Sequence, residues 1–341
     1  MPIVNPSSAV IAKTKAKYGR RLTQKDYAAL VKCETVGDIV RYLKTYTYYR
    51  NYLEKVKSDI HRGRLEEILR EQLFRNYLSL CRYHVSSSPV TGYIFRLTEI
   101  GELIKYLTLL SIGRPIDYLF TLPMYFDEHT EIPLNHLSDA HSYREMLDLL
   151  GTHGYRQVLE RFIPESDDQL DIAAISDAME IDSLEKLYAD IAAIKSKSER
   201  SALTALFDTL CDYNNYSRIM RLKKYYHLPN GAVREHLLPY GSLTGRRLDS
   251  LLSKESYQEI RSALVQTKVG RKAQNIEIDE EMAVKGKYDK CRHELYFSTS
   301  PEVVLLAYYI VSETELKNII TVIEGVRYSM EPQSILEMLI L

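Results

Sequence analysis

The 341-residue sequence has no tryptophan, only 14 glycines and 11 prolines, and four cysteines. Because glycine and proline interrupt helices, their scarcity favours long helices. The cysteines (Cys33, Cys81, Cys211 and Cys291) are far apart in the sequence and form no Cys-x-x-Cys pair, which argues against a zinc site. We therefore expect four reduced thiols, most of them buried.

The sequence also lacks a long hydrophobic run and a large net charge. Its longest apolar run, residues 303–311, is nine residues long, about half of the roughly 20 that span a bilayer. Residues 1–15 do not read as a secretory signal, because their charges follow the short apolar patch instead of preceding it. The net charge of −1 provides no positive field for nucleic acid. We expect a cytoplasmic chain with no transmembrane span and no nucleic-acid partner.

Catalytic motifs are missing as well. The sequence contains no phosphate-binding glycine loop, no nucleophile elbow and no His-Glu-x-x-His. Two polar groups could still form a hidden site: His136, Asp139 and His141, or Glu165 and Asp168. Solvated loop side chains are the simpler interpretation of both. The sequence therefore predicts a protein that is not an enzyme, with no catalytic, cofactor-binding or metal-binding residues and no small-molecule substrate.

Tyrosine and helical periodicity are what the sequence has in abundance. Its 27 tyrosines suit half-exposed faces of a helical shell, because the ring can be buried while the hydroxyl stays hydrated. Apolar residues recur at i, i+3 and i+4 in several segments, such as 65–80 and 316–323. Strict alternation of apolar and polar residues is rare. The predicted fold class is all-α.

Three parts of the sequence resemble one another. Short amphipathic segments at 38–45, 145–152 and 259–267 each begin with an acidic residue and end with threonine. A later motif begins with Glu99, Asp212 or Glu313 and continues with apolar residues. Similarity at this long period predicts one helical unit used three times. The predicted boundaries are 1–123, 124–241 and 242–341.

Charge is distributed unevenly over these units. Residues 1–123 carry 20 basic and 11 acidic side chains, whereas residues 124–241 carry 12 and 20, which suggests docking surfaces of opposite sign. The candidate partner interface consists of two basic clusters: Lys13, Lys15, Lys17, Arg20 and Arg21, and then Arg218, Arg221 and Lys223. The first could bind RNA or an anionic lipid surface, or be a solvated helix. The second could contact an acidic partner or stabilise its own helix C-terminus.

The C-terminal part of the sequence resembles a known family. Residues 301–308 (PEVVLLAY) and 315–319 (ELKNI), followed by Gly325, are similar to two helices of the C subunits of the prokaryotic A/V-type rotary ATPases. These proteins are the counterparts of the d subunits of eukaryotic vacuolar ATPases. Residues 12–22 and 212–223 match the corresponding positions of the family's first and second repeats, so the resemblance extends over essentially the whole chain.

The resemblance implies a fold and a function. In that family, three similar helical units surround a funnel with pseudo-threefold symmetry. Its wide mouth receives central-stalk subunits of the D and F types, and its base sits on the membrane proteolipid ring. The resemblance thus implies a non-catalytic central-stalk adaptor that couples ATP hydrolysis or synthesis to ion transport, located peripherally on the membrane through the complex. The alternative is a helical-repeat interaction scaffold unrelated to ATPases, but its usual period of about 34–47 residues is not seen.

Overall fold

The computed structural model describes residues 6–57, 59–83, 88–254, 256–267 and 279–341. These residues contain helices and no β-strand, which confirms the all-α prediction. In chain order the α-helices are α1 (Pro6–Tyr18), α2 (Gln24–Leu30), α3 (Val36–Tyr46), α4 (Arg50–Leu53), α5 (Arg62–Cys81), α6 (Pro89–Ser111), α7 (Tyr143–Leu150), α8 (Gly154–Leu159), α9 (Ile172–Ala192), α10 (Lys197–Lys224), α11 (Asn230–Glu235), α12 (Gly245–Leu252), α13 (Tyr257–Val265), α14 (Asp279–Phe297), α15 (Pro301–Arg327) and α16 (Pro332–Glu337). Short 3-10 helices follow α6 and α8: η1 (Pro115–Thr121), η2 (Asp127–His129), η3 (Leu134–Asp139), η4 (Glu160–Phe162) and η5 (Asp167–Gln169).

The three short helices that contain the similar segments, α3, α7 and α13, begin in the same way. Each has a serine or threonine N-cap whose hydroxyl accepts a hydrogen bond from the backbone of an acidic residue three positions later. The pairs are Thr35 with Asp38, Ser142 with Glu145, and Ser256 with Glu259. Such caps satisfy backbone N–H groups that the first helical turn leaves unpaired. The sequence similarity thus corresponds to a similar local structure.

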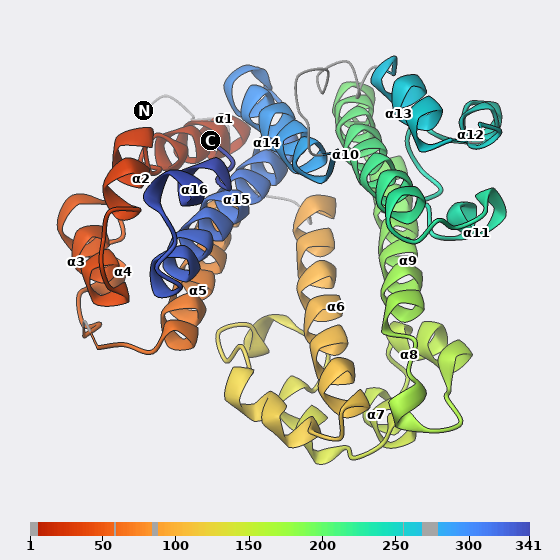
Figure 1. Ribbon diagram of the computed structural model, residues 1–341, viewed down its shortest axis with the longest axis horizontal. Helices are drawn as coiled ribbons and strands as arrows, with labels where there is room; N and C mark the ends of the chain where they lie inside the picture. The colour runs from red at the N-terminus through yellow and green to blue at the C-terminus, as the bar shows by residue number, and fades with distance from the viewer. Residues whose placement is uncertain (1–5, 58, 84–87, 255, 268–278) are drawn as a thin grey trace.

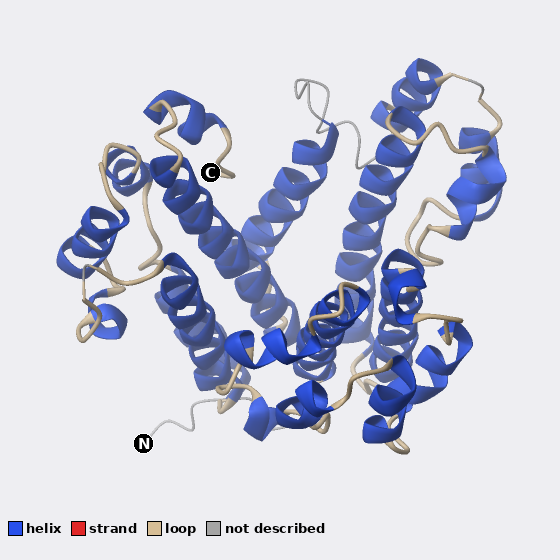
Figure 2. Ribbon diagram, turned by 60° about the horizontal axis from the view of Figure 1, so that its bottom comes forward, coloured by secondary structure: helices blue, strands red, loops and turns tan. Residues whose placement is uncertain are grey.

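Six long helices form the body of the molecule (Figure 1), and three of their pairs are α5 with α15, α6 with α9, and α10 with α14. These pairs are not separate, because α14 also packs extensively along α15. In Figure 2 the long helices converge toward the lower part of the view and spread apart toward its upper part. The low glycine and proline content allows these helices to run for 19 to 28 residues without a break.

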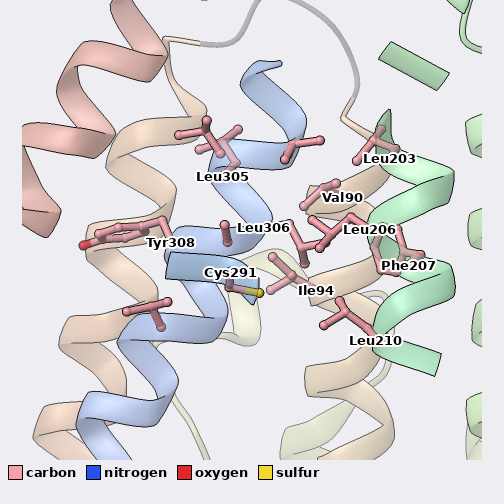
Figure 3. Packing of buried hydrophobic residues seen from close by; sticks show 14 of the residues in the cluster. Val90, Ile94, Leu203, Leu206, Phe207, Leu210, Cys291, Leu305, Leu306 and Tyr308 are labelled. Atoms are coloured by element: carbon pink, nitrogen blue, oxygen red, sulfur yellow. The ribbon is translucent and has the colours of Figure 1, made fainter. Parts of the chain in front are cut away.

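A central hydrophobic cluster forms where the helix pairs meet. Figure 3 shows Ile94 of α6, Phe207 of α10, Cys291 of α14 and Leu306 of α15 directed toward one another. The long apolar run at 303–311 forms the first half of α15 and is largely buried among α1, α5, α6, α10 and α14. A helix that is apolar on all sides is stable in such a position. None of the described helices is both long and apolar enough to cross a membrane.

Three further hydrophobic clusters lie outside the central one, each built on one helix pair. One joins α6 and α9 to η1, η3, α7 and α8, and another joins α10 and α14 to α11, α12 and α13. The third joins α5 and α15 to α2, α3, α4 and α16, and so combines residues 22–69 with residues 316–339. The unit boundaries at 123/124 and 241/242 stay a prediction.

The expectation that tyrosines would occupy half-exposed positions is wrong for many of them. Seven tyrosines are among the largest fully buried side chains: Tyr77, Tyr106, Tyr118, Tyr143, Tyr155, Tyr213 and Tyr216. Their hydroxyls can be buried because the protein itself supplies acceptors. Tyr106 donates to the carbonyl oxygen of Ala140 at 3.0 Å, and Tyr143 donates to that of Leu159 at 2.8 Å. Tyrosine here adds specific hydrogen bonds to an apolar core.

All four cysteines are free thiols, as expected from their spacing. Cys211 and Cys291 are buried, whereas Cys33 and Cys81 are half-buried. Burial raises the pKa of Cys211 and of Cys291 to about 12, so neither is a thiolate at neutral pH. Since the thiolate is the reactive form, these two side chains act as small core residues.

Candidate functional site

A buried carboxylate fastens the second half of α15 to the N-terminal region. Glu315 accepts hydrogen bonds from the backbone N–H of Leu22 at 2.8 Å and from the hydroxyls of Tyr48 and Tyr49 at 2.8 and 2.9 Å. Burial raises the pKa of the Glu315 carboxyl, although these three hydrogen bonds oppose the shift. Three residues later, Asn318 exchanges two hydrogen bonds with the backbone of Ile340.

The same arrangement occurs on α10. Asp212 accepts hydrogen bonds from the backbone of Ser242 and Leu243 at 2.7 and 3.0 Å. Three residues later, Asn215 exchanges two hydrogen bonds with the backbone of Leu238. On α10 and α15 alike, an acid and an amide at i and i+3 therefore hold a distant segment of the chain against a long helix.

A related pair of acids lies on α6. Glu99, which is buried, accepts hydrogen bonds from the hydroxyls of Thr130 at 2.7 Å and Tyr155 at 2.8 Å. Glu102, three residues later, accepts one from the hydroxyl of Tyr118 at 3.0 Å. The later of the two repeated sequence motifs thus has a structural role at Glu99, Asp212 and, on α15, Glu315.

A cavity of about 500 Å³ opens between the long helices α5, α6 and α15. Its lining includes Arg70 of α5, Gly101 of α6 and Glu313 of α15. Tyr125, which lies between η1 and η2, also lines it. A smaller cavity of about 200 Å³ lies between α6, α9, α10, α14 and α15, and both cavities are lined by Leu97, Tyr309 and Glu313. Open space therefore lies between α5, α6 and α15, beside the central hydrophobic cluster.

The cavities are lined by both charged and apolar side chains and are nearly neutral. Each carboxylate in their lining has a cation within ion-pair distance: Glu66 with Arg70 at 2.7 Å, Glu102 with Lys105 at 3.2 Å, Glu313 with Lys317 at 3.3 Å, and Glu180 with Arg218 at 2.5 Å. Lys287 of the smaller cavity donates to the side-chain oxygen of Asn214, and burial lowers the pKa of this lysine. Such a lining offers hydrogen-bonding groups without a strong field of one sign.

The five basic residues near the N-terminus lie on α1 and just after it. Lys13 lies over the ring of Tyr83, with the ammonium 5.3 Å from the ring centroid, and Lys15 donates to the carbonyl oxygen of Tyr296 at 3.0 Å. The remaining three have different surroundings: Lys17 donates to Asn76, Arg20 is exposed, and Arg21 stacks on Tyr18. This cluster therefore spreads across the surface around α1.

The second basic cluster belongs to a different region, at the C-terminal end of α10. Arg218 pairs with Asp177 at 2.9 Å and Glu180 at 2.5 Å, both on α9, and donates to the carbonyl oxygen of His236 at 2.6 Å. Its guanidinium thus joins α9, α10 and the end of α11. Lys223 donates to the carbonyl oxygen of Leu228, whereas Arg221 is exposed. Whether these residues and those on α1 contact a partner stays a prediction.

The structure predicts that Arg218 contributes to stability. Replacing Arg218 by alanine leaves the half-buried carboxylates of Asp177 and Glu180 without their cation, so the free energy of unfolding should fall by about 2 kcal/mol. Replacing the exposed Arg221 by alanine should change it by less than about 0.5 kcal/mol. Urea denaturation measures both values. Equal values for the two variants would show that the ion pairs contribute nothing.

The two groups considered as hidden sites lie on or next to the short 3-10 helices η3 and η5. His136 and Asp139 form an exposed pair at 3.0 Å. Glu165 and Asp168 are exposed, and Asp168 accepts a hydrogen bond from Ser166. Within the described part of the chain, no three histidine, cysteine, aspartate or glutamate side chains are grouped so as to hold a metal ion.

Comparison with known proteins identifies the family of this chain. The family model described as ATP synthase (C/AC39) subunit matches residues 10–338. The chain belongs to this ATP synthase subunit family. The resemblance inferred from residues 301–319 is thereby confirmed, and the alternative of a scaffold unrelated to ATPases is excluded. The family is one of structural subunits, which fits a chain without a recognisable catalytic motif.

The chain is also similar to the C subunit of the A-type ATP synthase of Methanothermobacter thermautotrophicus. The two sequences are 22% identical over 263 residues, which represent 76% of this chain and 66% of the relative. The aligned region is thus slightly less than two thirds of that protein.

The residues that line the cavities, such as Arg70, Gly101 and Lys287, were not predicted from the sequence. They come from helices far apart in the sequence, and no local pattern marks them. The repeated motif was recognisable at Glu99 and Asp212 from an acidic residue followed by apolar positions, but its third copy was placed at Glu313 instead of Glu315.

Proposed function

We propose that the chain is the non-catalytic central-stalk adaptor of an A/V-type ATPase and links the rotor shaft to the membrane proteolipid ring. The observation that carries the proposal is the polar, ion-paired cavity of about 500 Å³ between diverging helices. A hollow of this kind suits the end of a folded, hydrated protein better than a small metabolite, which usually requires an enclosed and mostly apolar pocket. Membership in a family of ATP synthase subunits supports the same assignment.

The proposal includes a funnel of three similar helical units with pseudo-threefold symmetry. Three kinds of correspondence support this arrangement: the helix pairs α5–α15, α6–α9 and α10–α14, the similar caps of α3, α7 and α13, and the buried acids Glu99, Asp212 and Glu315. Central-stalk subunits of the D and F types would enter the wide mouth, and the proteolipid ring would lie at the base. The protein would be cytoplasmic and peripheral on the membrane, and would couple ATP hydrolysis or synthesis to ion transport.

The proposed role requires a body that transmits torque without deforming. The central hydrophobic cluster supports this, because α15 packs on members of all three helix pairs and joins them in one close-packed core. Within the proposal, the basic residues around α1 and the exposed Arg221 contact neighbouring subunits or the membrane. Arg218 and Lys223 have less freedom to do so, because they already bind groups within the chain.

Filling the cavity tests the proposed docking of the stalk. A Cβ atom added at Gly101 meets no other heavy atom within 4 Å, and Gly101 lines the cavity. Gly101→Trp should therefore leave the fold intact and weaken binding of the purified D–F stalk complex by at least about tenfold, since the indole occupies space that the partner needs. Isothermal titration calorimetry measures the affinity.

Gly231 provides the matched control, because a Cβ atom there is equally unobstructed and the residue is exposed on α11, away from both cavities. Gly231→Trp should bind the stalk complex like the parent chain. Unchanged binding by a folded Gly101→Trp variant would refute docking in this cavity. Failure of the parent chain to bind the stalk complex would refute the adaptor role itself.

A further inference from the structure

Three segments without acidic residues meet on one side of the molecule. Residues 1–25, 72–98 and 295–301 contain no aspartate or glutamate. In the structure they include α1, the C-terminal end of α5 and the C-terminal end of α14. Since Asp and Glu make up 46 of the 341 residues, the joint absence of acids from these adjacent elements leaves the surface around α1 positively charged.

The contacts of α1 bring these elements together (Figure 1). Val10, Thr14 and Tyr18 form the buried side of α1. On one flank, Lys13 lies over Tyr83, which follows α5. On the other flank, the ring of Tyr18 packs edge to face on that of Tyr296 of α14, with centroids 5.8 Å apart, and Lys15 binds the carbonyl oxygen of Tyr296. Aromatic side chains thus lie on both sides of a helix that contains lysines and no acid.

The aromatic side chains of this surface are exposed to solvent. Phe297 is 71% exposed, Tyr296 is 55% exposed and Tyr83 is 42% exposed. Between the flanks, the outward ridge of α1 has only small exposed side chains, Ala12 and Ala16. An approaching surface can therefore reach the rings and the lysines together.

The acids toward the end of α14 and at the start of α15 are paired with cations or buried. Asp289 pairs with Arg292 at 3.0 Å, and Glu294 pairs with Lys290 at 2.5 Å. Glu302, at the start of α15, is buried and accepts a hydrogen bond from Ser88 at 2.7 Å. In the part of the chain that the structure describes, these three acids therefore do little to oppose the basic charges of Lys13, Lys15, Arg20 and Arg82.

We propose that the surface formed by Lys13, Lys15, Arg20, Arg82, Tyr83, Tyr296 and Phe297, here called the basic–aromatic surface, binds the headgroup region of an anionic phospholipid membrane. Basic side chains are attracted to anionic headgroups, and tyrosine and phenylalanine rings insert at the boundary between headgroups and acyl chains. The charges and rings come from three separate elements on either side of α1, which favours a broad planar partner over a single acidic peptide. The inference deepens the proposed function, which leaves open whether the basic residues around α1 contact neighbouring subunits or the membrane.

Vesicle sedimentation with the full chain tests this proposal. The parent chain should bind vesicles of phosphatidylcholine mixed with phosphatidylglycerol and should not bind vesicles of phosphatidylcholine alone. Each cation removed should weaken binding about fivefold, so the double variant Lys13→Gln and Lys15→Gln should lose about 25-fold. Phe297→Ser, which changes no charge, should weaken binding about tenfold because the ring no longer inserts.

Matched controls lie on η1 and α12, outside the basic–aromatic surface. Arg246 and Arg247 are exposed on α12, and Phe120 of η1 is 83% exposed. The double variant Arg246→Gln and Arg247→Gln, and the variant Phe120→Ser, should bind vesicles like the parent chain. If the control variants lost as much vesicle binding as the variants at Lys13, Lys15 and Phe297, the proposal would be overturned. Any exposed charge or ring would then contribute equally to binding.

Two other results would also overturn it. One is absence of binding to the phosphatidylglycerol vesicles. The other is displacement from those vesicles by polyglutamate or by single-stranded DNA, combined with no effect of Phe297→Ser, which would indicate an acidic macromolecule as the partner. A chain that binds the stalk complex and fails to bind the vesicles refutes only the lipid inference. A chain that binds the vesicles and fails to bind the stalk complex refutes the adaptor role and leaves the lipid inference standing.

Discussion

Replacement of Glu315 by alanine is expected to lower the free energy of unfolding by about 3–5 kcal/mol. The carboxylate is the acceptor for the backbone of Leu22 and for the hydroxyls of Tyr48 and Tyr49. Alanine leaves all three donors without that acceptor in a largely buried region, and the loss of a buried partner costs more than the hydrogen bond itself. Guanidinium denaturation followed by circular dichroism measures the change.

Glu313 is the matched control, because it has the same side chain on the same helix only two positions away. Its side chain is 38% exposed and pairs with Lys317 at 3.3 Å. An exposed i, i+4 pair contributes little, so Glu313→Ala should change the free energy of unfolding by less than about 0.5 kcal/mol. Similar losses for Glu313→Ala and Glu315→Ala would show that the effect comes from helix charge and not from the buried hydrogen bonds.

This pair of residues also shows how far the sequence could predict the molecule. The repeated pattern placed the third copy of the acidic motif at Glu313, whereas the acid that corresponds to buried Glu99 and Asp212 is Glu315. Two positions along a helix differ by about 200° around its axis, so the two acids face opposite directions. Local patterns reveal a helix with acidic residues, but only the packing of α15 against the N-terminal region determines which acid is buried.

The helical segments and their starts were predictable because they depend on neighbouring residues. A serine or threonine with an acid three positions later, as at Thr35 and Asp38, forms a cap whatever surrounds it. Arg218 is the opposite case. Its partners Asp177 and Glu180 are about 40 positions away in the sequence, so no local pattern reveals them. The basic cluster at the end of α10 suggested a docking surface, but one of its members, Arg218, instead joins α10 to α9.

A second large effect is expected at Gly286, where α14 packs against α10. A Cβ atom at this position would lie 2.1 Å from Cε1 and 2.4 Å from Cζ of the Tyr213 ring. Tyr213 is 2% exposed within a hydrophobic cluster and has no space to move aside. Gly286→Ala should therefore push α14 away from α10 and lower the free energy of unfolding by about 3 kcal/mol. Thermal unfolding followed by calorimetry measures the change.

Gly101 separates this steric effect from the general effect of replacing a helical glycine. Alanine has a higher helix propensity than glycine, and nothing lies within 4 Å of a Cβ atom at Gly101. Gly101→Ala should therefore stabilise the protein by about 0.5–1 kcal/mol, opposite in sign to Gly286→Ala. If Tyr213 causes the difference, the second replacement Tyr213→Leu should recover part of the stability lost in Gly286→Ala, because the two residues are in contact and their effects are then not additive. Full additivity of the two replacements would mean that the close approach of α14 to α10 does not depend on the glycine.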